Sequence, residues 1–289
     1  MGQYKRVILL DIDETLLTPD YQLTVSIERF RHLVRRVQSD GTYVGLNSDT
    51  PLFPLRSWAH RLDLKGPLIG EKGQVLSLSQ EDPPQLLGRM ADFFQNLRRQ
   101  LILRAQEAFP RTFVGLGDVT EFIRQGGRIY GEDQHAVLIN SYRQCSFSGY
   151  ALDLNNDGRL VNSGAIYNHF CSLVLSLARG EQERLEEADR NDRYGILILH
   201  EKGASKNRGF KRLIERIGTD VEYYMIGDSL SDRINVGTPV KLCAVGNASP
   251  EFKKIVRESG GVVAQKPFAD GVVEILSNLQ KPSYRSVAF

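Results

Sequence analysis

The chain has 289 residues, of which 41% are hydrophobic and 25% are charged, and its formal net charge is +2. This near-neutral balance argues against a broad nucleic-acid or membrane-surface footprint, and at ~150 residues per domain the length predicts about two domains. Three scattered cysteines and the lack of an apolar run of ~18 residues predict a protein of the reducing cytoplasm without a membrane span.

The first third of the chain alternates between strand and helix patterns. An apolar run at 6–10 ends at Asp11, which is typical of a strand buried on both faces of a parallel sheet. A helical stripe at 27–37 follows, then a strand at 42–46 and a helix that begins near Pro51. This alternation predicts a parallel α/β layer.

The pattern changes after Pro83-Pro84, a pair that interrupts both helices and central strands, so we expect a domain boundary there. The segments expected beyond it are a helix at 85–108, strands at 135–140 and 146–154, a helix at 166–177 and a charged, solvated helix face at 181–193. This mixture differs from the α/β alternation before it.

The α/β pattern returns near Gly195. The segments expected there are a strand at 196–199, a helix at 207–217, a strand at 221–226 followed by a further helix, and a strand at 240–245. The middle segment is therefore predicted to be an insertion. We expect one α/β core from residues 1–83 plus 193–289, interrupted by a second domain at 84–192.

Two carboxylates, Asp11 and Asp13, stand two residues apart in the loop that leaves the first predicted strand. In open α/β sheets ligands bind outside the carboxyl ends of the strands, so both side chains can face that crevice. The pair favours a nucleophilic aspartate beside an acid/base aspartate, and the alternative is an acidic turn that caps a helix.

A second acidic loop carries Asp228 and Asp232 after another apolar run. Acidic loops at the ends of two buried strands concentrate negative charge, which is costly unless a hard cation lies among them. Oxygen ligands favour Mg²⁺ in such a site. Two unrelated helix N-caps are the alternative interpretation.

Two further segments could hold an anion. Ser48, in NSDT, follows the second predicted strand, where a hydroxyl and backbone N–H groups can bind a phosphoryl oxygen or simply cap a helix. Lys206 opens a predicted helix, where its charge opposes the helix dipole. Pairing with a carboxylate and a phosphate would explain a lysine at that position.

In order and spacing these four segments resemble the motifs of the haloacid dehalogenase-like phosphohydrolases. The motif DxDxT stands at Asp11, Asp13 and Thr15, the hydroxyl motif at Ser48, the lysine at Lys206 in SKNRGFKRL, and GDxxxD at Asp228 and Asp232. The resemblance covers both ends of the chain, outside the predicted insertion. Within that family the chain resembles the branch with a large α+β cap, which includes sugar phosphatases and sucrose-phosphate phosphatases.

The resemblance implies a Rossmann-like parallel-sheet core with an inserted α+β cap that closes over the site and reads the leaving group. It also implies a cytoplasmic phosphatase that uses Mg²⁺ and acts on a small phosphorylated metabolite, above all a sugar phosphate. The implied catalytic residues are Asp11, Asp13 and Lys206. The implied substrate-binding residues are Thr15, Ser48 and Lys206. The implied metal ligands are Asp11, Asp13 through its backbone carbonyl, Asp228 and Asp232. The alternative role of Asp232 is to orient Lys206 or a metal-bound water.

Three departures from the family pattern bear on substrate orientation. Ser231 and Lys72 stand where relatives often have Asn, and the hydroxyl motif reads Ser-Asp-Thr where many have Thr-Gly-Arg. Two alternatives stay open. One is a phosphomutase that returns the phosphoryl group to a sugar, and the other is a non-catalytic phosphate-binding homologue.

Overall fold

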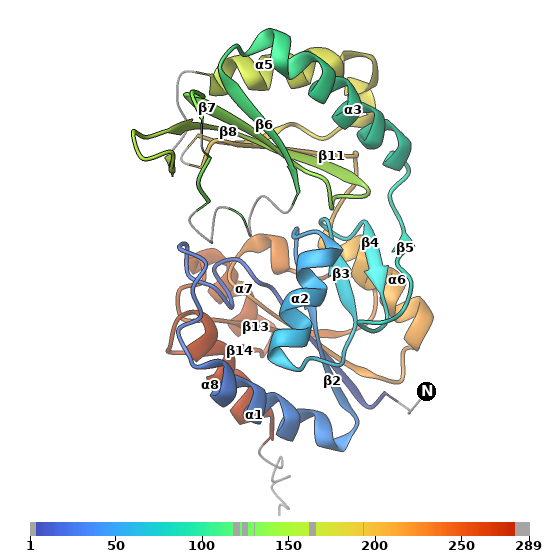
Figure 1. Cartoon of the computed structure of the whole chain (residues 1–289). Coiled ribbons are helices and arrows are strands. Elements are labelled where there is room, and N and C mark those ends of the chain that lie inside the picture. Colours follow the sequence, from blue (N-terminus) through green and yellow to red (C-terminus); the bar gives the residue numbers. More distant parts are fainter. Residues whose placement is uncertain are drawn as a thin grey trace, which may run out of the picture. The chain divides into compact units, whose positions relative to one another are not determined.

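The chain divides into two units, which we call the core unit (1–85 with 205–289) and the inserted unit (86–204) (Figure 1). The computed structural model describes residues 4–117, 122, 127–129, 131–161, 166–192 and 194–280. Within these ranges we find no helix with the length and apolar character needed to cross a membrane.

The core unit is built on an eight-stranded sheet with the order β14-β13-β12-β1-β2-β3-β4-β5. Its strands are β1 (Arg6–Leu10), β2 (Thr42–Asn47), β3 (Leu68–Gly70), β4 (Val75–Ser77), β5 (Gln85–Leu86), β12 (Glu222–Gly227), β13 (Val240–Ala244) and β14 (Val262–Val263). Neighbouring strands run parallel from β14 to β3, and β4 is antiparallel to β3. Residues 7–10 of β1 have no exposed surface, as expected for a central strand.

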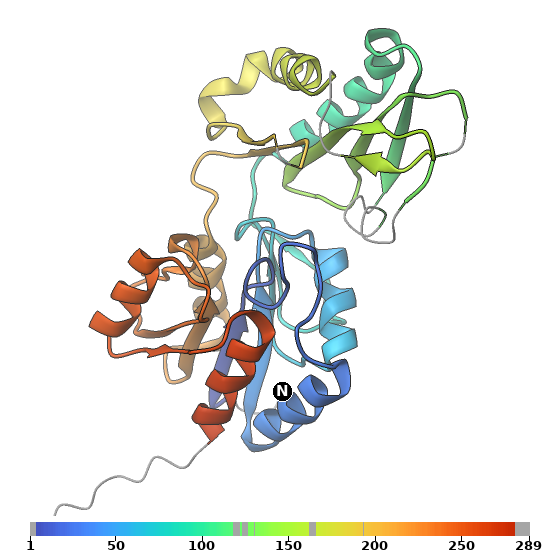
Figure 2. The same ribbon diagram turned by 90° about the vertical axis from the view of Figure 1, so that its left-hand side faces the viewer.

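Helices cover both faces of this sheet, with α1 and α2 on one side and α6 and α7 on the other (Figure 2). The helices are α1 (Ile27–Val37), α2 (Leu52–Leu62), α6 (Lys206–Ile217), α7 (Pro250–Glu258) and α8 (Phe268–Gln280). The predicted helix at 27–37 is confirmed, and Gly41 closes the short 3-10 turn after it with a left-handed φ of 85°.

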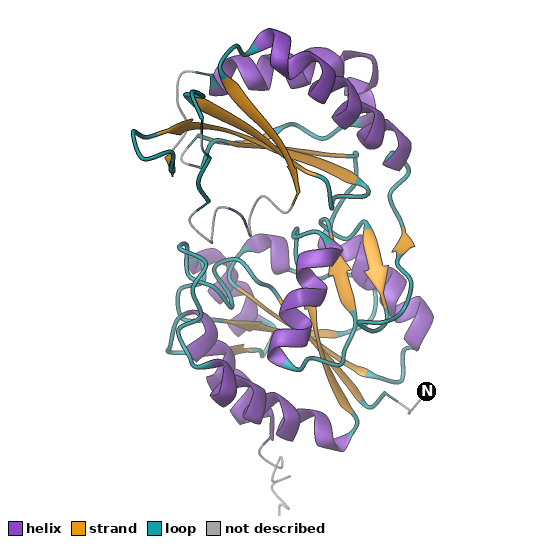
Figure 3. Cartoon of the chain, viewed as in Figure 1, coloured by secondary structure: helices purple, strands orange, loops and turns teal. Residues whose placement is uncertain are grey.

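The inserted unit has its own sheet, with the order β10-β11-β8-β7-β6 and β9 paired to β8. Its strands are β6 (Thr112–Gly117), β7 (His135–Asn140), β8 (Ser146–Leu154), β9 (Leu160–Val161), β10 (Asp189–Asn191) and β11 (Ile196–His200). Helices α3 (Ala91–Ala108) and α5 (Tyr167–Leu177) cover one face of it (Figure 3). Phe94, Phe147 and Phe170 are fully buried between these helices and the sheet, and they form part of a hydrophobic core that belongs to the inserted unit.

The predicted fold class, a parallel α/β core with an inserted α+β domain, is confirmed. In the structure the inserted unit begins after Gln85 and ends at Ala204, whereas the sequence predicted a segment that begins after residue 83 and ends at residue 192. The strand expected to reopen the core, β11, instead pairs antiparallel with β8 and β10 in the inserted unit. A buried apolar strand has the same sequence pattern in either sheet, which explains the error.

Three expected helices also differ. The helix expected from residue 85 begins at Ala91, because Gln85–Leu86 extends as β5. After β12 a 3-10 helix, Leu230–Asp232, replaces the expected helix. The charged run 181–193 contributes to a 3-10 helix, Arg179–Arg184, and to exposed strand β10, while residue 193 lies outside the described residues.

We predict that residues 86–204 fold when expressed alone, because they contain a complete sheet and their own core. Dispersed amide resonances and a cooperative urea transition are the expected results. The fragment 84–192 is the matched control. It lacks β11, which carries the buried side chains of Leu197 and Leu199 and lies between β10 and β8, so it should not fold. Equal folding of both fragments would contradict this assignment.

Candidate functional site

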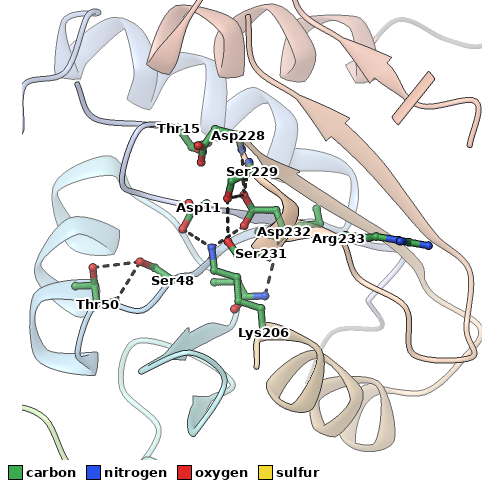
Figure 4. Close-up of polar contacts among 12 residues, drawn as sticks. Asp11, Thr15, Ser48, Thr50, Lys206, Asp228, Ser229, Ser231, Asp232 and Arg233 are labelled. Atoms are coloured by element: carbon green, nitrogen blue, oxygen red, sulfur yellow. Dashed lines mark hydrogen bonds and ion pairs between the residues drawn. The ribbon is translucent and has the colours of Figure 1, made fainter. Parts of the chain in front are cut away.

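The carboxyl ends of β1, β2 and β12 bring the predicted motifs together (Figure 4). β1 pairs in parallel with both neighbours, so Leu10 lies opposite Leu46 of β2 and Ile226 of β12. The N–H of Asp11 donates to the Ile226 carbonyl at 2.9 Å, which fixes Asp11 directly beyond the strand end. The motifs that follow these three strands therefore share one edge of the sheet.

Lys206 connects the two acidic motifs. It is the first residue of α6, and its Nζ lies 2.7 Å from Asp11 Oδ1 and 2.6 Å from Asp232 Oδ1. The lysine side chain is 6% exposed, that of Asp11 8% and that of Asp232 0%. Because a buried ammonium group is stable only beside compensating charge, these contacts account for a lysine at the start of a helix.

Asp232 fixes the loop that follows β12. Its Oδ2 accepts hydrogen bonds from the backbone N–H groups of Asp228 at 3.0 Å and Ser229 at 3.2 Å. Gly227 leaves room for this carboxylate, since a Cβ at that position would lie 2.1 Å from Oδ2. Both Asp232 oxygens thus contact protein groups, which suits a carboxylate that positions Lys206 and the loop.

Thr15 supports Asp228. Its side chain has no exposed surface, and its Oγ1 donates to Asp228 Oδ1 at 3.0 Å. The sequence predicted Thr15 as a substrate-binding residue, but the structure directs its hydroxyl at Asp228. Thr15 therefore acts here as a partner of a candidate metal ligand.

The hydroxyl motif contains a second hydroxyl that the sequence reasoning missed. Ser48 Oγ donates to Thr50 Oγ1 at 3.1 Å, and the Thr50 N–H donates back to Ser48 Oγ at 3.1 Å. Ser48 itself is fully buried. The turn could have been expected, because a serine hydroxyl commonly bonds the backbone two residues further on, which places the Thr50 hydroxyl beside Ser48.

The positive charge of Lys206 only partly balances the negative charges of the carboxylates at the site. Burial raises the pKa of Asp11 well above its usual value, Lys206 offsets part of this, and the charges of Asp232 and the exposed Asp13 raise it further. Burial lowers the pKa of Lys206, but the ion pairs with Asp11 and Asp232 outweigh it and keep the ammonium charged. Burial and the charge of Asp232 raise the pKa of Asp228 to about 6. The carboxylates outnumber their one buried cation.

This donor set fits a hard divalent cation. Asp11, Asp228 and Asp232 each offer an oxygen, and these oxygens lie within 4.8 Å of one another. Oxygen ligands with surplus negative charge are the environment that Mg²⁺ prefers. Since Asp232 already contacts Lys206 and two backbone N–H groups, Asp11 and Asp228 are the better candidates to hold the cation.

No protein-family model matches the chain. A phosphoglycolate phosphatase from Staphylothermus marinus is 24% identical over 282 residues, which cover 96% of this chain and 99% of that protein. A phosphoglycolate phosphatase from Methanopyrus kandleri is 29% identical over 105 residues, which cover 35% of this chain and 44% of that protein.

Solved structures share the fold over nearly the whole chain. A haloacid dehalogenase-like hydrolase from Bacteroides thetaiotaomicron superposes with a TM-score of 0.61 at 17% identity, covering 95% of this chain and 99% of that one. A trehalose-6-phosphate phosphatase related protein gives a TM-score of 0.57 at 13% identity, covering 95% and 96%. The expected family resemblance is thus confirmed at the level of the fold.

The raised pKa of Asp228 predicts a pH-dependent stability. A carboxyl group whose pKa rises from 3.8 to about 6 on folding stabilises the folded state fully below about pH 4. That stabilisation is lost as the pH rises through about 6. In chelator-treated protein, Asp228→Asn should therefore raise the free energy of unfolding near pH 8 by at most about 3 kcal/mol, and by less in proportion to the solvent exposure of the side chain, but by little near pH 4.

Urea unfolding followed by the fluorescence of Trp58, the single tryptophan, measures this effect within the core unit. The asparagine still offers an oxygen to the Thr15 hydroxyl, so the change removes charge and little else. Asp220→Asn, at an exposed position, is the control. The same gain at both pH values would show that burial of the Asp228 charge is not the cause.

Proposed function

We propose that this chain, which has the fold of the haloacid dehalogenase-like hydrolases, is a Mg²⁺-dependent phosphatase that acts on a small phosphorylated metabolite. The observation that carries the proposal is the contact of Lys206 with Asp11 at the strand edge that also bears Ser48 and Asp228. A carboxylate nucleophile, a buried cation and a hydroxyl group together provide what phosphoryl transfer needs.

The first step uses Asp11 and Asp13. An Asp11 carboxylate oxygen attacks phosphorus while the bond from phosphorus to the leaving oxygen breaks, which yields an aspartyl phosphate. Asp13 gives its proton to the leaving oxygen, so the product departs as an alcohol. Asp13 is exposed, so a leaving group can reach it, and it is close enough for its charge to affect Asp11.

The second step returns both aspartates to their starting states. Asp13, now ionised, takes a proton from a water molecule whose oxygen attacks phosphorus. The bond between phosphorus and Asp11 breaks, and inorganic phosphate leaves. Lys206 and Ser48 hold the phosphoryl oxygens through both steps, and their fixed positions stabilise the charge on the transferred group.

The cation would be held by Asp11 and Asp228, with the Asp13 backbone carbonyl as a further ligand and Asp232 alongside. A bound Mg²⁺ neutralises negative charge, which allows an anionic carboxylate to approach an anionic phosphate. Thr15 orients Asp228 for this purpose, and Asp232 orients Lys206.

We consider two classes of substrate, sugar phosphates and small phosphorylated acids. A sugar phosphate is the expectation from the sequence, and a trehalose-6-phosphate phosphatase related protein shares the fold. The two curated relatives are named for phosphoglycolate, a small phosphorylated acid. That the inserted unit selects among such substrates stays a prediction.

Asp11→Asn should abolish hydrolysis of a generic aryl phosphate, because an amide is not the nucleophile that a carboxylate is. Released aryl alcohol measures the activity, and circular dichroism shows whether the variant remains folded. Asp220→Asn, the same substitution at an exposed position, should keep full activity. Full activity of a folded Asp11→Asn variant would mean that the site is assigned wrongly.

A panel of sugar phosphates and phosphorylated acids, with phosphate release as the readout, tests the substrate class. We expect release with Mg²⁺ and none after chelation, because the surplus carboxylate charge otherwise repels the ester. An isomerised hexose phosphate without free phosphate would favour the phosphomutase. Failure on every ester of a broad panel would favour the non-catalytic homologue.

A further inference from the structure

A left-handed turn lies between β3 and β4. Three consecutive residues in it, Glu71, Lys72 and Gly73, have φ values of 51°, 56° and 85°. Two of them are not glycine, and such residues in the left-handed region cost on the order of 1 kcal/mol each. A strained turn of this kind persists only where its surroundings determine it strongly.

One side of the turn is bonded to the hydroxyl segment of the site. The Lys72 N–H donates to the Ser48 carbonyl at 3.3 Å, and the Glu71 N–H donates to the Thr50 carbonyl at 3.2 Å. In β3, immediately before the turn, the Ile69 carbonyl accepts from the Ser48 N–H at 3.0 Å. The backbone of Ser48 is therefore held from both directions by residues 69–72.

The other side of the turn touches the start of α6, which carries Lys206. A Cβ on Gly73 would lie 1.9 Å from the carbonyl oxygen of Ser205, the residue before the lysine. A Cβ on Gly209 would lie 2.9 Å from Gly73 Cα. Gly209 is one turn beyond Lys206 on the same helix, so the turn packs against the helical turn that bears the ammonium group.

We propose that this turn is a spacer that sets the distance between the Ser48 hydroxyl and the Lys206 ammonium, with Gly73 as its positioning residue. The inference rests on the proposed function, in which both groups hold the same phosphoryl oxygens. Their backbones come from segments far apart in sequence, and the turn contacts both. A displacement of ~1 Å at such groups can lower the rate about a hundredfold. Gly73 has no side chain, so it lets the turn approach α6 closely enough to keep the two groups at the right distance.

The test is Gly73→Ala. The added methyl group must push α6 away from the turn and so separate Lys206 from Ser48. We expect kcat to fall about a hundredfold and the dissociation constant for inorganic phosphate to rise about tenfold. The Mg²⁺ concentration for half-activation should change little, because Asp11 and Asp228 follow β1 and β12, which are part of neither the turn nor α6. Simple loss of folded protein would lower the measured kcat without changing the dissociation constant for phosphate.

Gly260→Ala is the matched control. It also replaces a glycine of positive φ, 72°, but its Cβ would meet no atom within 4 Å. Wild-type values of kcat and phosphate affinity in Gly73→Ala, or the same changes in Gly260→Ala, would overturn the proposal. If Gly73→Ala does not fold, Gly209→Ala acts on the same contact from the helix side. Its methyl group would meet the Ile69 Cγ2 at 2.4 Å, and the expected results are the same.

Calorimetric titration with inorganic phosphate in the presence of Mg²⁺ separates this proposal from the proposed function. If the wild-type protein binds phosphate and hydrolyses no ester, the proposed function fails, while a weakened phosphate affinity in Gly73→Ala still supports the spacer. If the wild-type protein neither binds phosphate nor hydrolyses any ester, both fail together. If it hydrolyses esters and Gly73→Ala is unimpaired, only the spacer fails.

Discussion

The ion pairs of one buried lysine determine how the ends of the chain meet. Lys206 stands at the start of α6 and contacts Asp11, which follows β1, and Asp232, in the loop after β12. Breaking a buried pair by removing one partner costs about 3–5 kcal/mol, because the other charge is left uncompensated. The strand, the helix and the loop are therefore held in one arrangement at the edge that carries the site.

The same cluster also opposes folding. Burial, and after it the charges of neighbouring carboxylates, raise the pKa values of Asp11 and Asp228, so their ionised forms are disfavoured. A divalent cation would remove that penalty, and the repulsion that weakens the metal-free protein becomes the driving force for metal binding. Stability given up at a site in return for affinity is a common compromise in enzymes.

Sequence patterns predicted the parts of the site that combine a buried strand with a polar loop. Residues 6–10 and 222–227 form β1 and β12, and Asp11 and Asp228 follow them. The pattern of β11 is equally apolar, but which sheet a strand joins depends on pairing with β8, far away in sequence. The partnership of Thr15 with Asp228 and the contact of Gly73 with α6 likewise depend on tertiary approach, which no local periodicity encodes.

The discontinuity of the core unit has a consequence for synthesis on the ribosome. Strand β1 is central, yet its partner β12 follows the whole inserted unit along the chain. At about 5–20 residues per second, the first segment waits on the order of ten seconds with one edge of β1 unpaired. During that interval the inserted unit can fold, while an apolar strand edge stays open to other chains. The nascent protein is thus most prone to aggregation before Lys206 has been made.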